Sequence, residues 1–323
     1  MKIAIDAMGG DNAPKVIIDG AMKAIEHRED LEIVLVGDEN KIKRHITKDE
    51  RISIIHTTET IGDEDDPIRA VRRKKDASLV LAATEVKEGR ADACISAGNT
   101  GALVVSGLFV IGRMKGIDRP ALSPTLPTTN GEGFLLLDAG ANVDVNPKNL
   151  VQYAIMGSIY CEKVRNIKKP RIGLLNVGTE ESKGNNVTKK AYKLLQKAPI
   201  NFIGNVEARY ITSGEADVIV CDGFVGNVVI KFAEGLAGTL FYLLKKELSA
   251  SFIRKIGGAM ALPAFKAVKK QLDYDEYGGA PLLGVNGVSI VCHGSSKAKA
   301  IKNAIYVAKK CVENNFVQMI ADS

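Results

Sequence analysis

The residues of this sequence with the clearest chemical potential lie in a polar loop inside a long uncharged run. Residues 93–112 carry no charge, and the sequence SAGNTG at 96–101 interrupts the apolar side chains. Glycines allow the backbone to approach a ligand closely, and the free N–H groups of a following helix would point at an anion. This loop is therefore a candidate cradle for a phosphate or an oxyanion. The alternative is purely structural, in which Thr100 caps a helix and the glycines make a tight turn.

Similar loops follow several other apolar segments of the chain. They occupy residues 6–11, 138–142, 176–179, 222–227 and 293–296, and each combines glycine with polar or charged residues. One such loop is a weak signal, because glycine turns follow strands in any α/β protein. The strands of a parallel sheet end at one edge, however, so these loops could surround a small anion together. Lys183 lies in a nearby loop and could add a compact positive charge.

These loops supply the predicted site residues. The predicted catalytic residues are Asn99, Thr100, Lys183 and His293. The predicted phosphate- and substrate-binding residues are Gly98, Gly101, Asn176, Gly178, Thr179, Asn185, Asp222, Asn227, Gly294 and Ser295. Of the four histidines, His293 alone lies in a motif loop, and its alternative role is an ordinary loop hydrogen bond.

The sequence lacks the common signatures of several other reaction classes. It has no G-x-S-x-G nucleophile elbow, no G-x-x-x-x-G-K-[ST] phosphate loop and no clustered metal ligands. The first loop also lacks G-x-G-x-x-G, which disfavours a dehydrogenase. We therefore expect neither a metal nor a cofactor. An enzyme without a protein nucleophile would let one bound substrate attack another directly, while the protein positions both and stabilises charge.

Alternating strands and helices are predicted to position these loops. Strands are predicted from the apolar segments at 2–6, 31–36, 91–96, 133–138, 171–175, 216–221 and 288–292. We expect residues 1–323 to form a single α/β domain around one three-layer, doubly wound and mostly parallel sheet. The run 93–112 is long enough for a membrane span, but its turn residues favour a strand, a turn and a helix over 100–111.

Positive charge is concentrated in two parts of the chain. Asp65, Asp66 and Pro67 are predicted to begin a long helix that continues to residue 86, with five basic residues between 69 and 75. Such a run is usually a solvated face, and the alternative is a docking surface for an acidic partner. Residues 231–272 contain eight basic and two acidic residues, an excess that equals the net charge of +6 of the whole chain.

The second basic stretch, residues 235–275, is predicted to be an amphipathic helical hairpin that protrudes from the domain. Its apolar residues 256–262 would form a turn between two helices. The predicted membrane contacts are Lys255, Leu262 and Phe265, which would meet an anionic lipid surface. The alternative is that these helices pack on the core or across a dimer interface. The stretch has no nucleic-acid-binding motif, so nucleic acid is not an expected partner.

The cysteines and the first residues of the chain indicate a cytoplasmic location. The five cysteines are scattered and odd in number, which argues against a disulfide framework and against a zinc site. Three of them, Cys94, Cys221 and Cys292, lie in apolar strand-like segments and are expected to be buried. Residues 1–6 enter a predicted strand directly, without the apolar core of a signal peptide.

Seven motifs along the chain carry a resemblance to a known family. They are IAIDAMGGDNAP within 1–14, SAGNTGA at 96–102, DRPALSPTL at 118–126, LLNVGTE at 174–180, DGFVGN at 222–227, YGGA at 277–280 and HGSS at 293–296. Across essentially its full length the chain resembles the PlsX-type phosphate acyltransferases of bacterial phospholipid synthesis. The resemblance implies transfer of a long-chain acyl group from acyl carrier protein to inorganic phosphate. It also implies a homodimer, peripheral association with the inner face of the cell membrane, and a fold similar to phosphotransacetylases and the isocitrate dehydrogenase group.

Two other functions are compatible with parts of the sequence. A phosphotransacetylase would use a short acyl group on coenzyme A, and would need a nucleotide site instead of a protein-docking surface. A non-catalytic membrane scaffold for lipid synthesis would explain the basic amphipathic stretch, but not the polar loops. Because a thiol with a pKa near ~8.5 is a good leaving group, attack by phosphate on a thioester needs no strong acid and agrees with the loop chemistry.

Overall fold

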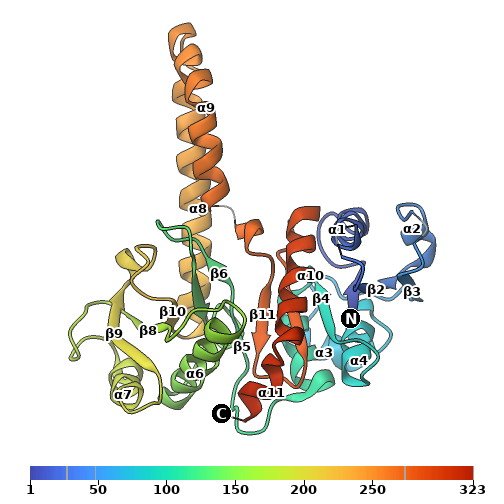
Figure 1. The fold of residues 1–323 in the computed structure, drawn as a ribbon, viewed down its shortest axis with the longest axis horizontal. Helices are drawn as coiled ribbons and strands as arrows, with labels where there is room; N and C mark the ends of the chain where they lie inside the picture. The colour runs from blue at the N-terminus through green and yellow to red at the C-terminus, as the bar shows by residue number, and fades with distance from the viewer. Residues whose placement is uncertain (27, 48, 273, 323) are drawn as a thin grey trace.

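The computed structural model describes residues 1–26, 28–47, 49–272 and 274–322. Its strands form two sheets that lie side by side, with a long helical hairpin projecting from the second sheet (Figure 1). The class predicted from the sequence, α/β with mostly parallel strands, is confirmed. The expectation of one continuous sheet is wrong.

The first sheet has the strand order β3-β2-β1-β4-β12-β11-β5. Its strands are β1 (Lys2–Asp6), β2 (Glu32–Gly37), β3 (Ile52–His56), β4 (Ala93–Ser96), β5 (Ala121–Leu122), β11 (Ala280–Leu283) and β12 (Val288–Val291). The strands from β3 to β12 are parallel, whereas β11 is antiparallel to both of its neighbours. The carboxyl ends of β1, β4 and β12 therefore lie next to one another at one edge.

Helices cover both faces of the first sheet. Alternate residues of β1 point to opposite faces, so Ile3 and Ile5 join one apolar cluster and Ala4 joins another. The first cluster contains residues of α1 (Lys15–Ile25) and α10 (Ala298–Glu313), which also pack against each other. The second contains residues of α4 (Ser78–Lys87) and α5 (Thr100–Ser106).

The second sheet has the strand order β6-β7-β10-β8-β9. Its strands are β6 (Thr125–Leu126), β7 (Phe134–Leu137), β8 (Arg171–Asn176), β9 (Asn201–Glu207) and β10 (Val218–Val220), and only β6 is antiparallel to its neighbour. Leu135 and Leu137 face the cluster that holds α6 (Pro147–Lys163), and Phe134 and Leu136 face the start of α8. The other short helices are α2 (Glu39–Lys43), α7 (Asn186–Leu195), α11 (Phe316–Ala321), η2 (Ala208–Tyr210) and η3 (Tyr274–Glu276).

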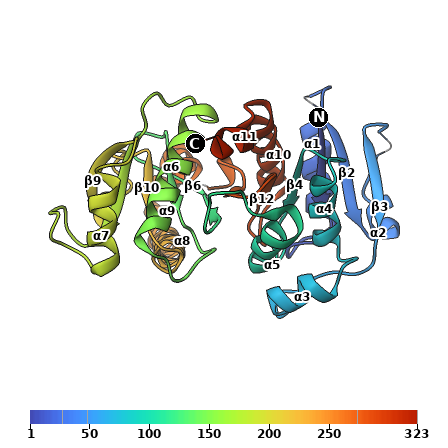
Figure 2. The same cartoon turned by 90° about the horizontal axis from the view of Figure 1, so that it is seen from below.

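One short segment of the chain connects the two sheets. β5 pairs with β11 of the first sheet, and β6 pairs with β7 of the second, although only two residues lie between them. The Ser123 N–H donates to the Pro281 carbonyl of β11, and the Pro124 carbonyl accepts from the Leu136 N–H of β7, each at 3.0 Å. The chain therefore crosses from one sheet to the other at these two residues (Figure 2).

Two of the predicted helices differ from expectation. The long helix predicted from Pro67 is divided into α3 (Pro67–Arg73) and α4, because Lys74 leaves helical dihedral angles and the Ser78 N–H donates to the Glu59 carbonyl. The predicted start of α3 is confirmed, since the Asp66 side chain caps it and Pro67 is in its first turn. The helix predicted over 100–111 is α5, which continues as the π-helix η1 (Gly107–Gly112).

The hairpin consists of α8 (Gly223–Leu248) and α9 (Phe252–Leu272). The predicted turn at 256–262 is wrong, because these residues are helical and Pro263 also lies inside α9. The chain reverses at 249–251 instead, so Leu262 lies along the side of the hairpin and Phe252 and Ile253 lie near its tip. Lys255 is one turn from the tip, and Phe265 is half-buried further down.

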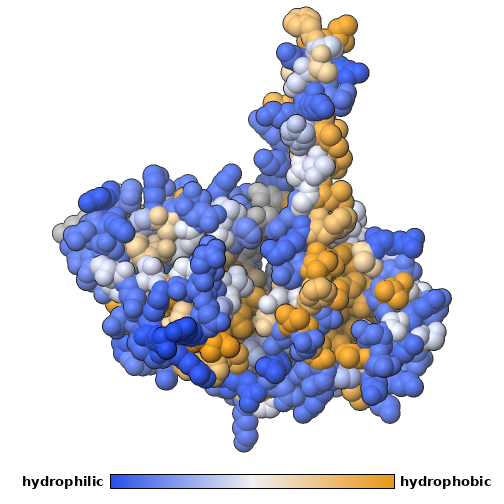
Figure 3. Space-filling view, turned by 180° about the vertical axis from the view of Figure 1, so that it is seen from behind, coloured by the Kyte–Doolittle hydropathy of each residue, from blue (hydrophilic) through white to orange (hydrophobic). Residues whose placement is uncertain are grey.

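Apolar side chains remain uncovered along the hairpin (Figure 3). By length and composition α8 could cross a bilayer. The core helix of a soluble protein passes the same test, but such a helix is mostly buried, whereas only 6% of the most apolar window of α8 is buried. The other apolar run, 93–112, is divided between β4 and the helix that follows it. All five cysteines are free and buried, as predicted for the three in apolar strand-like segments.

Candidate active site

The loops after β1 and β4 are joined by a buried carboxylate. The Asp6 Oδ2 atom accepts a hydrogen bond of 2.7 Å from the Ser96 hydroxyl, and that hydroxyl accepts one of 3.0 Å from the Gly98 N–H. Asp6 is 3% and Ser96 2% exposed. Burial raises the pKa of Asp6, while hydrogen bonds from Ser78, Ser96 and the backbone oppose the rise. This pair fixes the position of the predicted anion loop at 96–101.

Glycine is required where these two loops meet. A Cβ atom on Gly9 would lie 2.6 Å from the Asp6 carboxylate and 2.7 Å from the Gly98 nitrogen. The loop after β12 joins the same group, because the Asp11 N–H donates to the Gly294 carbonyl at 2.9 Å. The structure therefore brings together the loops after β1, β4 and β12, as the strand-end prediction required.

Asn99 caps the start of α5 and connects it to a neighbouring loop. Its Oδ1 atom accepts from the Ala102 N–H at 2.9 Å, and its Nδ2 atom donates to the Gly62 carbonyl at 3.1 Å. These two bonds orient its amide and join α5 to residue 62, and the catalytic role of Asn99 stays a prediction. Thr100 is exposed as the first residue of the helix. The N–H groups of Thr100 and Gly101 precede the first intrahelical bond, so they are available to an anion.

His293 is exposed at the carboxyl end of β12. Its Nδ1 atom lies 2.8 Å from the Ser295 hydroxyl and accepts from the Ser295 N–H at 3.2 Å. The accepting Nδ1 atom of a neutral ring requires the proton on Nε2. Gly294 is half-buried and Ser295 exposed. The predicted residues of this loop therefore lie beside the loop that carries Gly98.

A second group of loops forms at the carboxyl ends of β7 and β10. Asp138 is fully buried, and its carboxylate accepts from the N–H groups of Leu122, Gly140, Ala141 and Asn142 and from the Asn142 amide, at 2.6 to 3.2 Å. Burial raises the pKa of Asp138, and the N–H donors oppose the rise. The Asn142 amide also donates to the Tyr153 hydroxyl at 3.0 Å. Asp138 therefore holds the 138–142 loop in one conformation.

The start of α8 packs directly on this loop. The Asp222 side chain caps α8 by accepting from the Val225 N–H at 2.8 Å, and the Gly223 N–H donates to the Asn142 carbonyl at 2.8 Å. A Cβ atom on Gly226 would lie 1.9 Å from the Asp138 carbonyl oxygen, so only glycine fits there. Asn227 packs against Gly140. The predicted residues Asp222 and Asn227 therefore belong to this second group.

The 138–142 loop connects the two groups. Ala139 and Ala141 pack against the apolar cluster that contains Ala102 and Leu103 of α5. The Ala139 N–H also donates to the Leu122 carbonyl at 3.0 Å, at the end of β5. Elements of both sheets thus meet between α5 and the start of α8, and the candidate site lies at this junction.

The loop after β8 stands apart in its hydrogen bonding. Asn176 donates to the Lys183 carbonyl at 3.3 Å, and Asn185 caps α7 through the N–H groups of Val187 and Thr188. The Lys183 ammonium lies 3.9 Å from Glu180 and is half exposed. Gly178 packs against the Lys183 side chain, and Thr179 adjoins Glu180. Since β10 separates β8 from β7, a role of these five predicted residues in the site stays a prediction.

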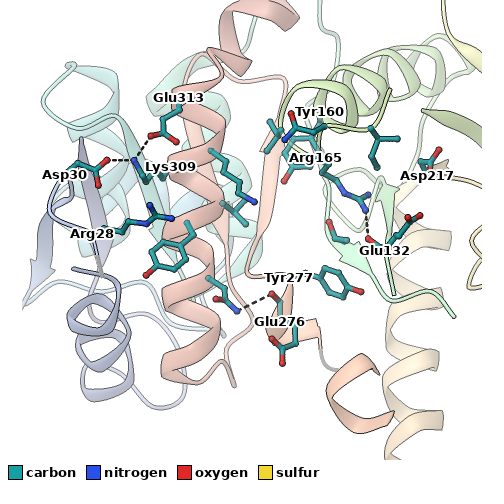
Figure 4. Close-up of a pocket in the computed structure, with 18 residues that line it drawn as sticks. Arg28, Asp30, Glu132, Tyr160, Arg165, Asp217, Glu276, Tyr277, Lys309 and Glu313 are labelled. Atoms are coloured by element: carbon teal, nitrogen blue, oxygen red, sulfur yellow. Dashed lines mark hydrogen bonds and ion pairs between the residues drawn. The ribbon is translucent and has the colours of Figure 1, made fainter. Parts of the chain in front are cut away.

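A large cleft lies at the opposite edge of the sheets. It has a volume of about 1120 Å³ and is lined by residues that precede strands, among them Asp30, Glu132 and Asp217 (Figure 4). The Arg165 guanidinium donates to the carbonyls of Glu132 and Gly133, and Lys309 pairs with Asp30 and Glu313. Four basic and five acidic residues line the cleft, so it offers no net positive charge to an anion.

Two residues that organise the site are not among the predicted site residues. Asp6 and Asp138 were recognised only as strand ends, yet each is a buried carboxylate that holds a loop. An acid that directly follows three or four apolar residues, as in KIAID and FLLLD, is the signal that could have identified them. Within the described residues, no group of three or more His, Cys, Asp or Glu side chains is placed to bind a metal ion.

Comparison with known proteins assigns the family. A model of the fatty acid synthesis protein family matches residues 1–319. A phosphate acyltransferase of Geobacillus sp. (strain WCH70) is 59% identical over 323 residues, covering 100% of this chain and 98% of the relative. That of Bacillus cytotoxicus is 57% identical over 321 residues, covering 99% and 97%. The chain belongs to the phosphate acyltransferase family. It is therefore an acyltransferase, as the sequence motifs predicted.

Solved structures show that this acyltransferase shares its fold with other enzymes. A phosphotransacetylase from Streptococcus pyogenes matches with a TM-score of 0.66 at 18% identity, covering 97% of this chain and 94% of that structure. A branched-chain phosphotransacylase from Enterococcus faecalis V583 matches with a TM-score of 0.60 at 14% identity, covering 97% and 99%. At these identities the likeness concerns the fold, and it confirms the expected phosphotransacetylase-like architecture.

Proposed function

We propose that this acyltransferase moves a long-chain acyl group from acyl carrier protein to inorganic phosphate, and that the acyl phosphate serves phospholipid synthesis. The observation that supports this most is the loop at 96–101, which Asp6 and Ser96 hold at the start of α5. It presents N–H groups of a helix N-terminus to an anion. The name of the relatives, phosphate acyltransferase, agrees with phosphate as that anion.

The reaction would be a direct displacement. A phosphate oxygen attacks the thioester carbonyl carbon, and the carbonyl becomes a tetrahedral oxyanion. The oxyanion collapses, the C–S bond breaks, and the thiolate leaves and takes a proton from water. We assign phosphate binding to the N–H groups of Thr100 and Gly101, because these groups precede the first intrahelical bond of α5. Hydrogen-bond donors that the fold already holds in position stabilise developing charge without having to move during the reaction.

Trapping with hydroxylamine tests the reaction. Incubation of the enzyme with palmitoyl-acyl carrier protein and phosphate should give acyl phosphate, which hydroxylamine converts to a hydroxamate. Omission of phosphate should lower the signal to that of an enzyme-free control, in which hydroxylamine attacks the thioester directly. Enzyme-dependent hydroxamate formed equally well without phosphate would instead indicate a covalent acyl-enzyme. Acetyl-coenzyme A used faster than the carrier-protein thioester would favour the phosphotransacetylase alternative.

Two substitutions at Asn99 separate catalysis from folding. Asn99→Ala should lower turnover more than about tenfold. Because it also removes the cap of α5, it should lower the free energy of unfolding by about 1 kcal/mol. Asn99→Asp keeps the capping oxygen but loses the bond to the Gly62 carbonyl, so it should retain stability while turnover falls. Wild-type turnover in both variants would remove Asn99 from the site.

We further propose that the enzyme is a cytoplasmic homodimer that associates with the inner face of the cell membrane through its hairpin. The exposed apolar side chains of α8 and α9 need a cover, and their basic neighbours suit an anionic surface. Among them, Phe224, Val228 and Phe232 lie near the body, and Phe252 and Ile253 lie near the tip. The first group suits a second copy of the chain, and the second suits lipid.

A further inference from the structure

A basic surface with an apolar centre lies next to the candidate site. It consists of Arg69, Arg72 and Arg73 on α3 together with Ile68 and Phe109, and we refer to it as the α3 face. Ile68 is 51% and Phe109 58% exposed. The Arg72 guanidinium lies 5.5 Å from the centre of the Phe109 ring. Exposed aromatic and arginine side chains in contact are typical of protein-binding surfaces.

The arginines of the α3 face are not neutralised within the chain. In the described residues, none of the three forms an ion pair, whereas the neighbouring Lys74 pairs with Asp65 at 2.6 Å. The acidic residues of this region flank the helix, with residues 63–66 before it and Asp76 after it. Asp66 caps it through the Arg69 N–H, and Asp63 and Glu64 are exposed in the preceding loop. The α3 face therefore keeps its positive charge for an external partner.

The α3 face is attached to the anion loop. Helix α3 packs against α5, and a Cβ atom on Gly101 would lie 2.7 Å from the Pro67 ring (Figure 2). The Asn99 amide also donates to the Gly62 carbonyl, just before α3. A protein bound on this face would thus lie beside the N–H groups that would hold phosphate.

The other basic surface suits a donor protein less well. The hairpin carries Lys245, Lys246, Arg254 and Lys255 around its outer half, which projects away from both sheets (Figure 1). A donor bound there would hold its thioester away from the loops at the carboxyl edge. The α3 face is therefore the better donor-binding surface because of its position beside these loops, and not because of the amount of its charge.

We propose that the α3 face docks an acidic surface of the acyl carrier protein, so that its thioester arm enters beside the 96–101 loop. This proposal rests on the proposed function, since it assigns the surface that receives the acyl donor. Carboxylates of the partner would pair with the three arginines, and an apolar side chain would cover Phe109. Complementary charge of this kind sets association rate and orientation.

The test is a binding titration with a charge-matched control. Fluorophore-labelled acyl carrier protein is titrated into the wild-type enzyme, into Arg69→Glu/Arg72→Glu and into Lys189→Glu/Lys190→Glu. The control lysines are exposed on α7, at the far end of the second sheet. We expect Kd to rise about tenfold or more in the α3 variant and less than about twofold in the control. Phe109→Ala, which changes no charge, should raise Kd about threefold.

Three results distinguish the possible failures. Equal Kd values in both double variants would overturn the docking proposal while leaving the acyl transfer intact. Loss of sedimentation with anionic vesicles in the α3 variant, with unchanged affinity for the carrier protein, would identify a membrane contact and also overturn it. If the wild-type enzyme neither binds the carrier protein nor forms acyl phosphate from its thioester, the proposed function itself fails, and the docking proposal fails with it.

Discussion

The body of this enzyme and its hairpin use apolar residues in opposite ways. In β7 all four residues, Phe134–Leu137, are buried, and both faces of the strand are covered. In α8 the two buried residues are Gly223 and Gly226 at its base, and no described residue of α9 is buried. Burial of apolar surface contributes roughly 25 cal/mol per Å². The body thus gains its stability within one chain, whereas the exposed apolar surface of the hairpin can gain such stability only from a partner or a lipid surface.

The largest difference in stability should appear when one methyl group is added to a glycine packed on the body and, separately, to an exposed glycine of the hairpin. Gly226→Ala puts a Cβ atom 1.9 Å from the Asp138 carbonyl oxygen, so it should lower the free energy of unfolding by about 3 kcal/mol or more. Gly235→Ala, on the same helix, meets nothing within 4 Å. It should be neutral or stabilise by up to about 1 kcal/mol. Urea denaturation followed by circular dichroism measures both, and equal values would contradict the contrast.

Ion pairs should show a smaller difference between the same two regions. In the body, Arg171 donates to both oxygens of Asp217, at 3.0 and 2.8 Å, and the Asp217 side chain is 9% exposed. Burial raises the pKa of Asp217, but hydrogen bonds and charge from Arg171 outweigh it and lower the pKa overall. Because Arg171 is itself 40% exposed, we expect Asp217→Asn to lower the free energy of unfolding at pH 7 by only about 1–2 kcal/mol.

The pH dependence of this effect follows from the lowered pKa. A carboxyl group with a folded-state pKa below its unfolded value near ~3.9 stabilises the protein above that pH. The stabilisation is lost as the pH falls toward the folded-state pKa. The difference between wild type and Asp217→Asn should therefore shrink below about pH 4. In the hairpin, Arg254 and Glu247 pair at 2.7 Å with 56% and 67% exposure, so Glu247→Gln should change stability by less than about 0.5 kcal/mol at any pH.

The smallest effect on folding, but a measurable one on binding, is expected at the hairpin tip. Ile253 is 81% exposed near the tip, and Leu262 is 48% exposed along the side. Ile253→Glu should lower co-sedimentation with anionic vesicles about fivefold, with unfolding free energy within about 0.5 kcal/mol of wild type. Leu262→Glu should lower it less. A larger loss of co-sedimentation in Leu262→Glu than in Ile253→Glu would support the membrane contact that the sequence predicted at Leu262.

The sequence by itself determined the fold class and the loops that carry the chemistry. Apolar segments followed by glycine and polar residues indicated the ends of parallel strands, and the structure brings three of these loops together at one edge. The family was also identifiable from spaced motifs such as SAGNTGA and DGFVGN. These features are local in the chain, because strand period, turn residues and helix caps act over a few neighbours.

Only the tertiary structure decided how these parts are placed. Two sheets form instead of one because the segment 121–126 pairs with β11 and then with β7, and these partners are distant in the sequence. The roles of Asp6 and Asp138 depend on donors up to 90 residues away, such as Ser96. The sequence predicted the tip of the hairpin near Leu262, but the chain reverses at 249–251, because Pro263 is accommodated within an exposed helix. The loop at 96–101 was recognisable as an anion loop from its residues, but its attachment to the α3 face required the packing of α3 on α5.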